Sequence, residues 1–402
     1  LLNLRTGGEI MKPKLRFKEF SDEWCETTLG ETTTFKQGIQ VDVDKQFSKP
    51  FDNSVRFIRI VDYTQNTKDI RYISKPANAN YVDEHDVVLV RYGATAGFVG
   101  HGIKGVIANN MFTVTPNSNI NKDFLYTILK QDKIYNKLNS SNGSSAMPAL
   151  NFGSVSILKF SYPSIDEQNK LTNLINLLDK KIELQSKKIE DLKLFKKGLI
   201  NKVINELSFY KKIELSELGV TYTGLTGKTK EDFENGESHY IPFADILNNK
   251  INIDILPLVN IKKNEIQNKV RKYDLFFNTS SETANEVGLC TTLNFDIENT
   301  YLNSFCFGYR INDVNKINNE YLNILLHSNI YRKKISILGQ GFTRVNISKN
   351  KLMKIKVLIP TYKEQLEIVD VINIENNKLV LEESKLYKLQ KVKKGLMQNM
   401  FV

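Results

Sequence analysis

The sequence of 402 residues has few of the residues that build disulfide or metal sites. It contains only three cysteines, an odd number with no Cys-x-x-Cys spacing, and only four histidines. The histidines are scattered along the chain, at His85, His101, His239 and His327. This pattern offers no zinc-ligand cluster, so we expect no bound structural metal and a reducing, cytoplasmic environment.

Long apolar runs are also missing. No stretch of about 18 apolar residues occurs, and a hydrophobic content of 41% is typical of a globular chain, which excludes a transmembrane role. A chain of this length is expected to form two or three domains. Residues 1–10 lack the features of a secretory signal and are interpreted as a leader or remnant ahead of Met11, the expected native start.

Catalytic motifs are absent as well. Gly227-Lys228-Thr229 ends like a phosphate-binding loop, but the pattern needs a glycine where Tyr222 stands, and a lone Gly-Lys-Thr is more often a surface turn. No Asn/Asp-Pro-Pro-aromatic stretch is present to hold an adenine for methylation, and no glycine-rich turn suggests a bound nucleotide. We therefore predict no catalytic residues.

Positive charge, in contrast, is in excess. The chain has 56 Lys and Arg against 45 Asp and Glu, for a net charge of +11 and an isoelectric point near 9.2. This balance favours an anionic partner such as nucleic acid or an acidic membrane surface, and charge alone does not choose between them.

An internal repeat organises the whole sequence. The segment that starts at Pro163 with Pro-Ser-Ile-Asp-Glu-Gln is echoed from Pro360 by Pro-Thr-Tyr-Lys-Glu-Gln, an offset of 197 residues (360 − 163) that continues without a gap. A weaker match upstream relates 57–62 to 240–245 and Gly38 to Gly224. Each half therefore joins a divergent module to a better preserved segment.

The preserved segments read as long helices with apolar residues spaced alternately by three and four, which is a heptad seam. We expect the two seams to pack together, most simply as an antiparallel coiled coil that relates the modules by a pseudo-two-fold axis. The seam residues are Ile175, Leu178, Ile182, Leu192 and Leu199 in the first helix and Ile372, Leu379, Leu389 and Leu396 in the second. Leu194 and Leu207 are expected to be exposed for partners.

The modules read as mixed α/β. Strands are expected at 57–61, 86–91, 274–278 and 305–311, and helices at 123–138 and 320–335. The predicted fold class is thus α+β, with the first module at 11–162, its helix at 163–205, the second module at 206–359 and its helix at 360–402.

Loops rich in Gly, Ser, Thr, Asn and Arg recur in both modules, at 91–97, 142–147, 278–283 and 339–344. Such residues can approach phosphates through the backbone and contact base edges through Arg, Asn and Gln. An ordinary turn is the competing interpretation of each loop taken alone.

Taken together, these features resemble the specificity subunit of type I restriction-modification enzymes. The resemblance depends on the Pro-x-x-x-Glu-Gln openings, the Lys-Lys-Gly-Leu helix ends, the stretch 15–24 (LRFKEFSDEW), and the stretches 86–97 and 339–346, and it covers nearly all of the chain after Met11.

The resemblance implies two target-recognition domains that each read half of a bipartite DNA sequence, with the helices setting the gap. It implies no catalysis by this chain. The partners implied are double-stranded DNA, two methyltransferase subunits and restriction/translocase subunits. S-adenosylmethionine, ATP and Mg²⁺ would be bound by those partner subunits.

The two modules differ in the compared loops. Arg91-Tyr92-Gly93 is matched to Asn278-Thr279-Ser280, which predicts two different half-sites. The candidate DNA contacts are Lys36, Gln37, Arg91, Tyr92, Ser144 and Ser145 in the first module and Thr223, Asn278, Ser280, Thr283, Gln340, Thr343 and Arg344 in the second.

Two other functions stay open. A coiled-coil assembly adaptor with incidental basic charge would bind DNA with little salt dependence, whereas a DNA reader shows a steep dependence. A self-sufficient nuclease or methyltransferase would be active as a purified chain, and the missing motifs argue against it.

Overall fold

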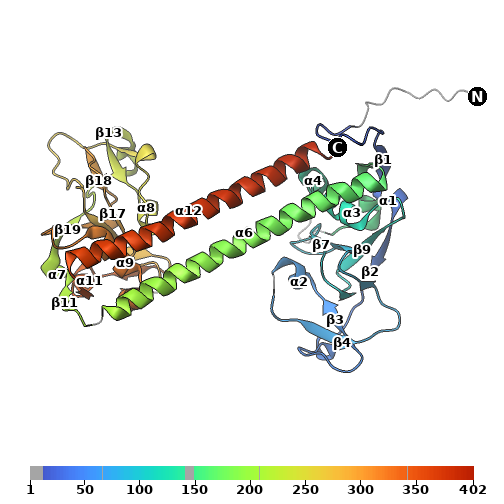
Figure 1. The fold of residues 1–402 in the computed structure, drawn as a ribbon, viewed down its shortest axis with the longest axis horizontal. Coiled ribbons are helices and arrows are strands. Elements are labelled where there is room, and N and C mark those ends of the chain that lie inside the picture. Colours follow the sequence, from blue (N-terminus) through green and yellow to red (C-terminus); the bar gives the residue numbers. More distant parts are fainter. Residues whose placement is uncertain (1–11, 66, 141–148, 208, 342) are drawn as a thin grey trace, which may run out of the picture. The chain divides into compact units, whose positions relative to one another are not determined.

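The computed structural model describes residues 12–65, 67–140, 149–207, 209–341 and 343–402, and it divides into two compact units (Figure 1). The first unit comprises Leu1–Gln185 and Lys385–Val402, and the second comprises Ser186–Ser384. Both are mixed α/β, which confirms the predicted fold class. Each of the two long helices contributes residues to both units.

The first unit contains two four-stranded sheets. One is antiparallel, with the strand order β2-β9-β6-β7, and the other has the order β4-β3-β8-β5 with a parallel β3–β8 pair. Its strands are β1 (Cys25–Thr28), β2 (Thr33–Gln37), β3 (Ser54–Ile58), β4 (Arg71–Ser74), β5 (Tyr81–Val82), β6 (Val87–Val90), β7 (Val99–Gly100), β8 (Gly105–Ile107), β9 (Met111–Pro116) and β10 (Lys159–Tyr162). Its helices are α1 (Leu29–Thr32), η1 (Val43–Lys45), α2 (Ile60–Thr64), α3 (Lys122–Leu129), α4 (Asp132–Ser140) and α5 (Phe152–Ser156).

The second unit repeats this plan. The sheet β12-β19-β15-β17 corresponds to β2-β9-β6-β7, and the parallel β13–β18 pair corresponds to β3–β8. Its strands are β11 (Lys212–Glu214), β12 (Gly219–Thr223), β13 (Phe233–Ile241), β14 (Leu258–Val259), β15 (Leu275–Asn278), β16 (Ser280–Ser281), β17 (Cys290–Thr292), β18 (Thr300–Leu302), β19 (Cys306–Ile311), β20 (Gly339–Gln340), β21 (Val345–Ile347) and β22 (Lys356–Leu358). Its short helices are α7 (Leu215–Leu218), η2 (Lys230–Asp232), α8 (Phe243–Leu247), η3 (Ile253–Ile255), α9 (Asn319–His327), α10 (Asn329–Ser336) and α11 (Lys349–Met353).

Two glycines show how closely the repeated backbone is kept. A Cβ atom at Gly38 would lie 2.2 Å from the backbone oxygen of Ala108, and a Cβ atom at Gly224 would lie 2.1 Å from that of Asn303. Only glycine allows the chain to pass so close to a neighbouring backbone. The weak upstream match of Gly38 to Gly224 is therefore confirmed as a structural equivalence.

The long helices are α6 (Ile165–Glu206) and α12 (Tyr362–Asn399), and they run antiparallel within each unit (Figure 1). In the second unit Lys188 contacts Glu382, and Lys196, further along α6, contacts Asn376, which comes earlier on α12. In the first unit Lys393 contacts Asp179. Among the described helices, none is long and apolar enough to cross a membrane.

The heptad periodicity of the sequence corresponds to the inner faces of these helices. Ile175, Ile372 and Leu379 are buried. The other predicted seam residues are half-buried, namely Leu178, Ile182, Leu192, Leu199, Leu389 and Leu396. An amphipathic seam of this kind stabilises a long helix through packing rather than through intrinsic propensity.

Each unit has its own main core, in which one end of each long helix takes part. In the first unit, Phe401 packs edge-on against Trp24 and stacks on Phe124, with ring centroids 6.5 and 5.9 Å apart. In the second unit, Ile204 and Leu207 join the core. The expectation that Leu207 is exposed is thus wrong, because Leu207, directly after the end of α6, packs in this core, whereas Leu194 is 67% exposed as expected.

Most expected elements are present, with two differences. The strand expected at 57–61 ends at Ile58, because α2 begins at Ile60. Where one helix is expected at 123–138, the chain forms two, α3 and α4. Where one is expected at 320–335, it forms α9 and α10. In the second unit the break falls at Ser328, whose side chain accepts a hydrogen bond from the Tyr331 backbone and so caps α10.

Candidate nucleic-acid interface

In the first unit, Arg91 is the centre of the candidate interface. It follows β6, and its guanidinium lies 4.9 Å from the ring centroid of Tyr92 and 5.0 Å from that of Phe152. It donates hydrogen bonds to Gln37 Oε1 and to the backbone oxygen of Leu150. Three predicted residues, Gln37, Arg91 and Tyr92, are therefore brought together, with Tyr92 40% exposed. Held in this way, the planar guanidinium loses little freedom on binding.

Lys36 does not join this group. Neighbouring residues of a strand point to opposite faces, and Lys36 Nζ donates a 2.9 Å hydrogen bond to the backbone oxygen of Ala79. The other two candidates in this unit, Ser144 and Ser145, lie outside the described residues. Ala149, the first described residue after this gap, forms a β-bridge with Tyr92.

In the second unit, the predicted loops meet in a small sheet with the strand order β16-β21-β20. Arg344 is exposed, and its guanidinium lies 5.6 Å from the ring centroid of Phe305, which is 54% exposed. Gln340 and Thr343 are exposed on the same β20–β21 hairpin. These three residues form an accessible surface with a cation, an amide and a hydroxyl.

The remaining candidates of this unit differ in exposure. Thr283 is exposed in the loop after β16, and Thr223 is exposed at the end of β12, where its Oγ1 accepts a hydrogen bond from Asn268. Asn278 is fully buried and Ser280 is 5% exposed. Asn278 instead donates to the backbone oxygen of Glu286 within the protein.

The burial of Asn278 corrects the sequence matching of the two halves. Val90 pairs with Met111 across β6 and β9, while Asn278 pairs with Cys306 across β15 and β19. Asn278 therefore corresponds to buried Val90, and Thr279 corresponds to Arg91. A shift of one residue reverses the face to which a strand side chain points, which is why Asn278 lies inside.

Lys228 of the Gly-Lys-Thr turn is not available for a phosphate. Its side chain is 2% exposed and donates to Glu265 and to the backbone oxygen of Asn260. The hydrogen bond from Lys228 is the main cause that lowers the pKa of Glu265 to about 2. Lys228 is thus held in an ion pair with Glu265, which agrees with the interpretation of the motif as an ordinary turn.

Each unit also has a cleft where its short helices meet the two long ones. The cleft of the first unit has a volume of about 800 Å³ and that of the second about 620 Å³. Their lining residues are related by the offset of 197: Tyr126 with Asn323, Ile175 with Ile372, Gln390 with Lys193, and Lys394 with Lys197, among others. The clefts are therefore one feature, present twice.

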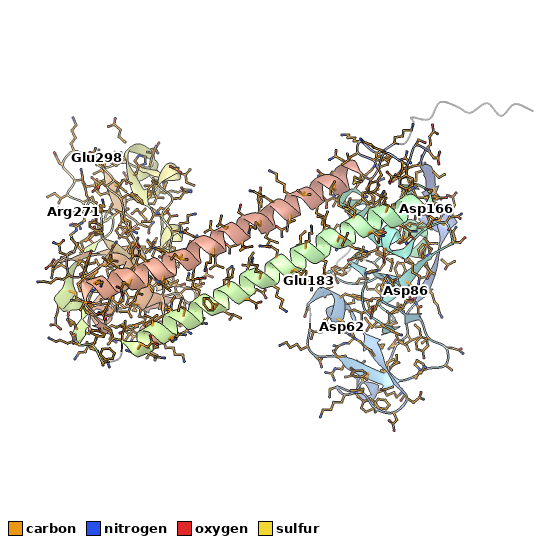
Figure 2. All side chains as sticks on the ribbon, viewed as in Figure 1. Asp62, Asp86, Asp166, Glu183, Arg271 and Glu298 are labelled. Atoms are coloured by element: carbon orange, nitrogen blue, oxygen red, sulfur yellow. The ribbon has the colours of Figure 1, made fainter. Side chains whose placement is uncertain are left out.

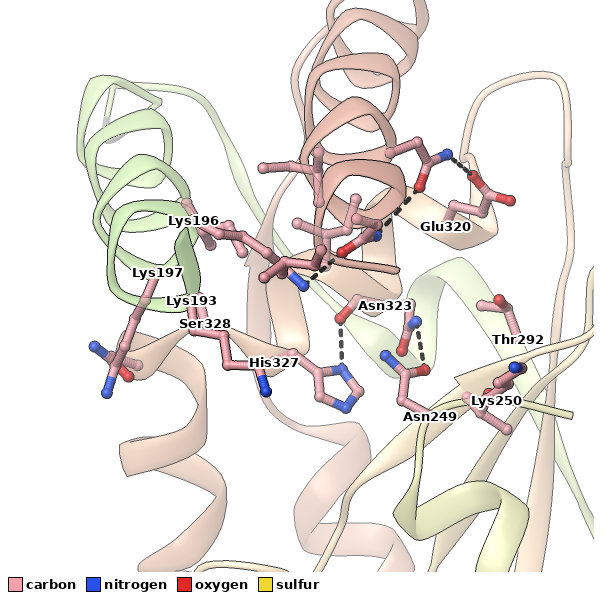
Figure 3. Close-up of a pocket in the computed structure, with 18 of the residues that line it drawn as sticks. Lys193, Lys196, Lys197, Asn249, Lys250, Thr292, Glu320, Asn323, His327 and Ser328 are labelled. Carbon is pink, nitrogen blue, oxygen red and sulfur yellow. Dashed lines mark hydrogen bonds between the residues drawn. The ribbon is translucent and has the colours of Figure 1, made fainter. Parts of the chain in front are cut away.

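The two clefts differ in charge at one equivalent contact. In the first unit Lys393 forms an ion pair with Asp179. In the second, Lys196 Nζ donates to Asn376 Oδ1 at 2.6 Å, so an amide replaces the carboxylate (Figure 3). Burial, and then the charge of Lys193, lower the pKa of Lys196.

His327 lies at the cleft of the second unit (Figure 3). Its Nδ1 is 3.9 Å from the sulfur of Cys290. Burial lowers the pKa of His327 to about 4 and raises that of Cys290 to about 12. A thiolate nucleophile needs the opposite shifts, so this pair is not prepared for cysteine chemistry. The Nδ1 atom of His327 bonds the backbone oxygen of Asn323, whereas its buried Nε2 has no protein partner.

Two histidines come together in the first unit, although the sequence indicated no pairing. His85 Nδ1 and His101 Nε2 each lie 3.1 Å from Oδ1 of Asp123. The three residues come from separate segments, so their spacing along the chain gives no signal. The repeated clefts do have a signal in the sequence. The residues that cap α3 and α9, Asn121 and Asn318, keep the offset of 197, so the helices that line the two clefts are repeated.

Known proteins of one family resemble both halves of the chain. The family described as "Type I restriction modification DNA specificity domain" matches twice, at residues 21–194 and 208–391. A curated relative, the type I restriction enzyme MjaVIII specificity subunit of Methanocaldococcus jannaschii, is 22% identical over 341 residues, covering 79% of this chain and 78% of its own length.

Solved structures share the fold. A type I restriction-modification system S subunit from M. genitalium matches with a TM-score of 0.60 at 15% identity, covering 98% of this chain and 99% of that one. A chain from a study of complex assembly and conformational transition of the type I R-M system matches with a TM-score of 0.58 at 14% identity, covering 93% and 96%.

Proposed function

Because the chain belongs to the family of type I restriction modification DNA specificity domains, we propose that each of its units reads one half of a bipartite duplex target. The observation that carries this proposal is the contrast between a repeated scaffold and unlike loops. The strand registers and the clefts are kept in both units, whereas Arg91 is replaced by Thr279 at the equivalent position.

The loops supply the two kinds of contact that a duplex requires. Arg91 has a planar donor group already oriented by Gln37 and two aromatic rings, which suits bidentate contact with guanine O6 and N7. In the second unit, Gln340 and Arg344 present an amide and a guanidinium from one hairpin. Since the donors differ between the units, the two half-sites are expected to differ.

The net charge of +11 supplies the part of the affinity that does not depend on sequence. Lysines and arginines that neutralise phosphates release counterions, so the affinity should fall steeply with salt. Lys36 is exposed on β2 away from the Arg91 cluster, and it is assigned to phosphate contact rather than to base reading.

The long helices are proposed to fix the distance between the half-sites and to bind partner subunits. Their outer faces carry large exposed apolar residues at repeat-equivalent positions, so each helix offers the same apolar side chains to a partner. The equivalent pairs are Leu177 with Ile374, Leu184 with Leu381, and Phe195 with Val392. Side chains project along both helices in Figure 2, where Glu183 marks α6.

The duplication of these apolar positions and of the clefts supports two copies of one partner. We infer that the partners are two methyltransferase subunits, with restriction/translocase subunits in the larger assembly. The chemistry is then supplied by those partners, which would bind S-adenosylmethionine, ATP and Mg²⁺, while this chain selects the sequence.

The proposal is tested by selecting duplexes from a randomised pool with the purified assembly, at several salt concentrations. A DNA reader enriches two short conserved blocks with a constant gap and loses affinity steeply with salt. An assembly adaptor enriches no sequence and shows a shallow salt dependence. Alanine variants of Gln340 and Arg344 should change only one of the two blocks, whereas an Asn377→Ala variant, on the exposed face of α12, should change neither.

A further inference from the structure

The cluster of His85, His101 and Asp123 in the first unit has the geometry of a metal site. The ligand atoms of the three side chains all lie within 4.8 Å of one another, and each histidine nitrogen is 3.1 Å from the carboxylate oxygen. In a tetrahedral zinc site with bonds of about 2.0–2.1 Å, neighbouring ligand atoms are about 3.3 Å apart. Only small side-chain adjustments are needed to place an ion between them.

The three residues are held by separate elements of the fold. His85 is in the turn that precedes β6, His101 directly follows β7, and Asp123 is in the first turn of α3. The ring of His101 stacks on Tyr126, with centroids 4.3 Å apart and an interplanar angle of 19°. Its side chain and that of Asp123 are 20% and 21% exposed, so two of the three ligands are already positioned by packing.

The surroundings favour a cation. Asp83 Oδ1 accepts a hydrogen bond from the backbone of His85, and Asp86, labelled in Figure 2, directly precedes β6. Lys122 is the basic group beside them, and it is paired with Asp86 at 2.6 Å and with Asp83 at 3.5 Å. Two neutral imidazoles and one carboxylate are a ligand set that suits Zn²⁺ better than Mg²⁺ or Ca²⁺, which prefer oxygen ligands.

We propose that His85 Nδ1, His101 Nε2 and an oxygen of Asp123 bind one Zn²⁺ ion, with solvent at the remaining coordination position. The ion connects the turn before β6, the end of β7 and the start of α3. Arg91 follows the other end of β6, so the ion stiffens the strand that carries the reading residue of the first unit.

The second unit does not repeat the ligands. By the strand registers, Tyr273 and Thr292 stand where His85 and His101 stand, and Glu320 corresponds to Asp123. Glu320 is engaged by Asn294 and Asn373. The proposal therefore requires one ion per chain, in contrast to the two copies of the clefts.

The test uses the full-length chain without a histidine tag. Zinc is titrated in competition with a chromophoric chelator, Co²⁺ is used as a spectroscopic probe of the ligand geometry, and hydrogen exchange is measured with and without Zn²⁺. We expect one Zn²⁺ per chain, the visible absorption of a four-coordinate Co²⁺ site, and added protection confined to residues 83–90, 99–104 and the start of α3.

Two variants decide the assignment. His101→Asn should abolish the Co²⁺ absorption, and His85→Asn, at a position that is 67% exposed and so safe for folding, should weaken Zn²⁺ binding by at least about 10-fold. His239→Asn in the second unit is the matched control and should bind as the unchanged chain does. Absence of saturable Zn²⁺ binding, a stoichiometry of two, or equal binding by His85→Asn and the control would overturn the proposal.

Discussion

Gln168 and Gln365 make the same three hydrogen bonds, each in its own unit. Gln168 donates to the backbone oxygens of Asn119 and Pro163 at 2.9 and 2.8 Å and accepts from the backbone nitrogen of Asn121 at 2.9 Å. Gln365 does the same at the positions 197 residues later. Both side chains are fully buried, so the Gln of the Pro-x-x-x-Glu-Gln opening joins the start of a long helix to the loop before α3 or α9.

Removal of either glutamine should therefore destabilise its own unit. Gln168→Ala removes the side-chain partner of the Asn119 and Pro163 carbonyls and of the Asn121 amide, and an unpaired group costs about 1–3 kcal/mol where it is buried, so a loss of roughly 3 kcal/mol is expected. Urea unfolding of the full chain measures it. Gln390→Ala, at an exposed position of α12, should cost less than about 0.5 kcal/mol, and equal effects of the two variants would contradict the role.

The separate substitutions Asp179→Asn and Asn376→Asp should change the free energy of unfolding in opposite directions. Asp179→Asn removes the ion pair with Lys393, and Asn376→Asp gives Lys196 a carboxylate that it lacks now. Since both sites are partly exposed, each change should be about 0.5–1 kcal/mol in the free energy of unfolding and should shrink at high salt. Asn377→Asp, on the outer face of the same helix, is the control; a stabilisation of equal size there would show a general charge effect instead.

His327 should make the stability of the second unit dependent on acid pH. Burial lowers its pKa to about 4, below the ordinary 6.5, and the charges of Arg332 and Lys196 act in the same direction. The unfolded chain then binds the proton more readily, so the contribution is fully present above about pH 6.5 and is lost as pH falls towards 4.

Between pH 7 and pH 5, protonation of His327 should lower the free energy of unfolding of the second unit by on the order of 2 kcal/mol. His327→Gln, followed by urea unfolding at several pH values, should flatten this part of the profile, with His239→Gln as the control. A profile that keeps its slope in His327→Gln would show that other groups cause it.

Arg91 and Arg344 should each affect one half-site only. Arg91→Lys loses the planar donor pair and should weaken binding by roughly 1–3 kcal/mol, with relaxed discrimination at one position of the first half-site. Arg344→Lys should do the same in the second half-site. Lys36→Ala should weaken all duplexes alike and reduce the salt slope by about one; fluorescence anisotropy with duplexes altered in one half at a time separates these outcomes.

The sequence predicts best those features that are local or repeated. The helix seam at Ile175 and Ile372 follows from spacing alone, and the equivalence of Gly38 and Gly224 follows from the repeat. Strand register is less accessible, because sequence similarity did not show that Asn278 matches Val90 rather than Arg91, and a one-residue error reverses the predicted face.

Features formed by distant segments could not be predicted. His85, His101 and Asp123 meet only because β6, β7 and α3 pack together, and Phe152 and Phe305 carry no motif that would place them under Arg91 and Arg344. The helix expected at 320–335 breaks at Ser328 because the hydroxyl of that residue caps a new helix, α10. The spacing of apolar residues carries no signal for such a break.

The proposed function requires two unlike units, joined by helices of fixed length, to read one split target. Its most direct test is to express the chain with a cognate methyltransferase subunit and to map methylated adenines across the host genome by long-read sequencing. A single motif of two different blocks with a constant gap is expected. A continuous motif, or no new methylation in the presence of an assembled complex, would contradict it.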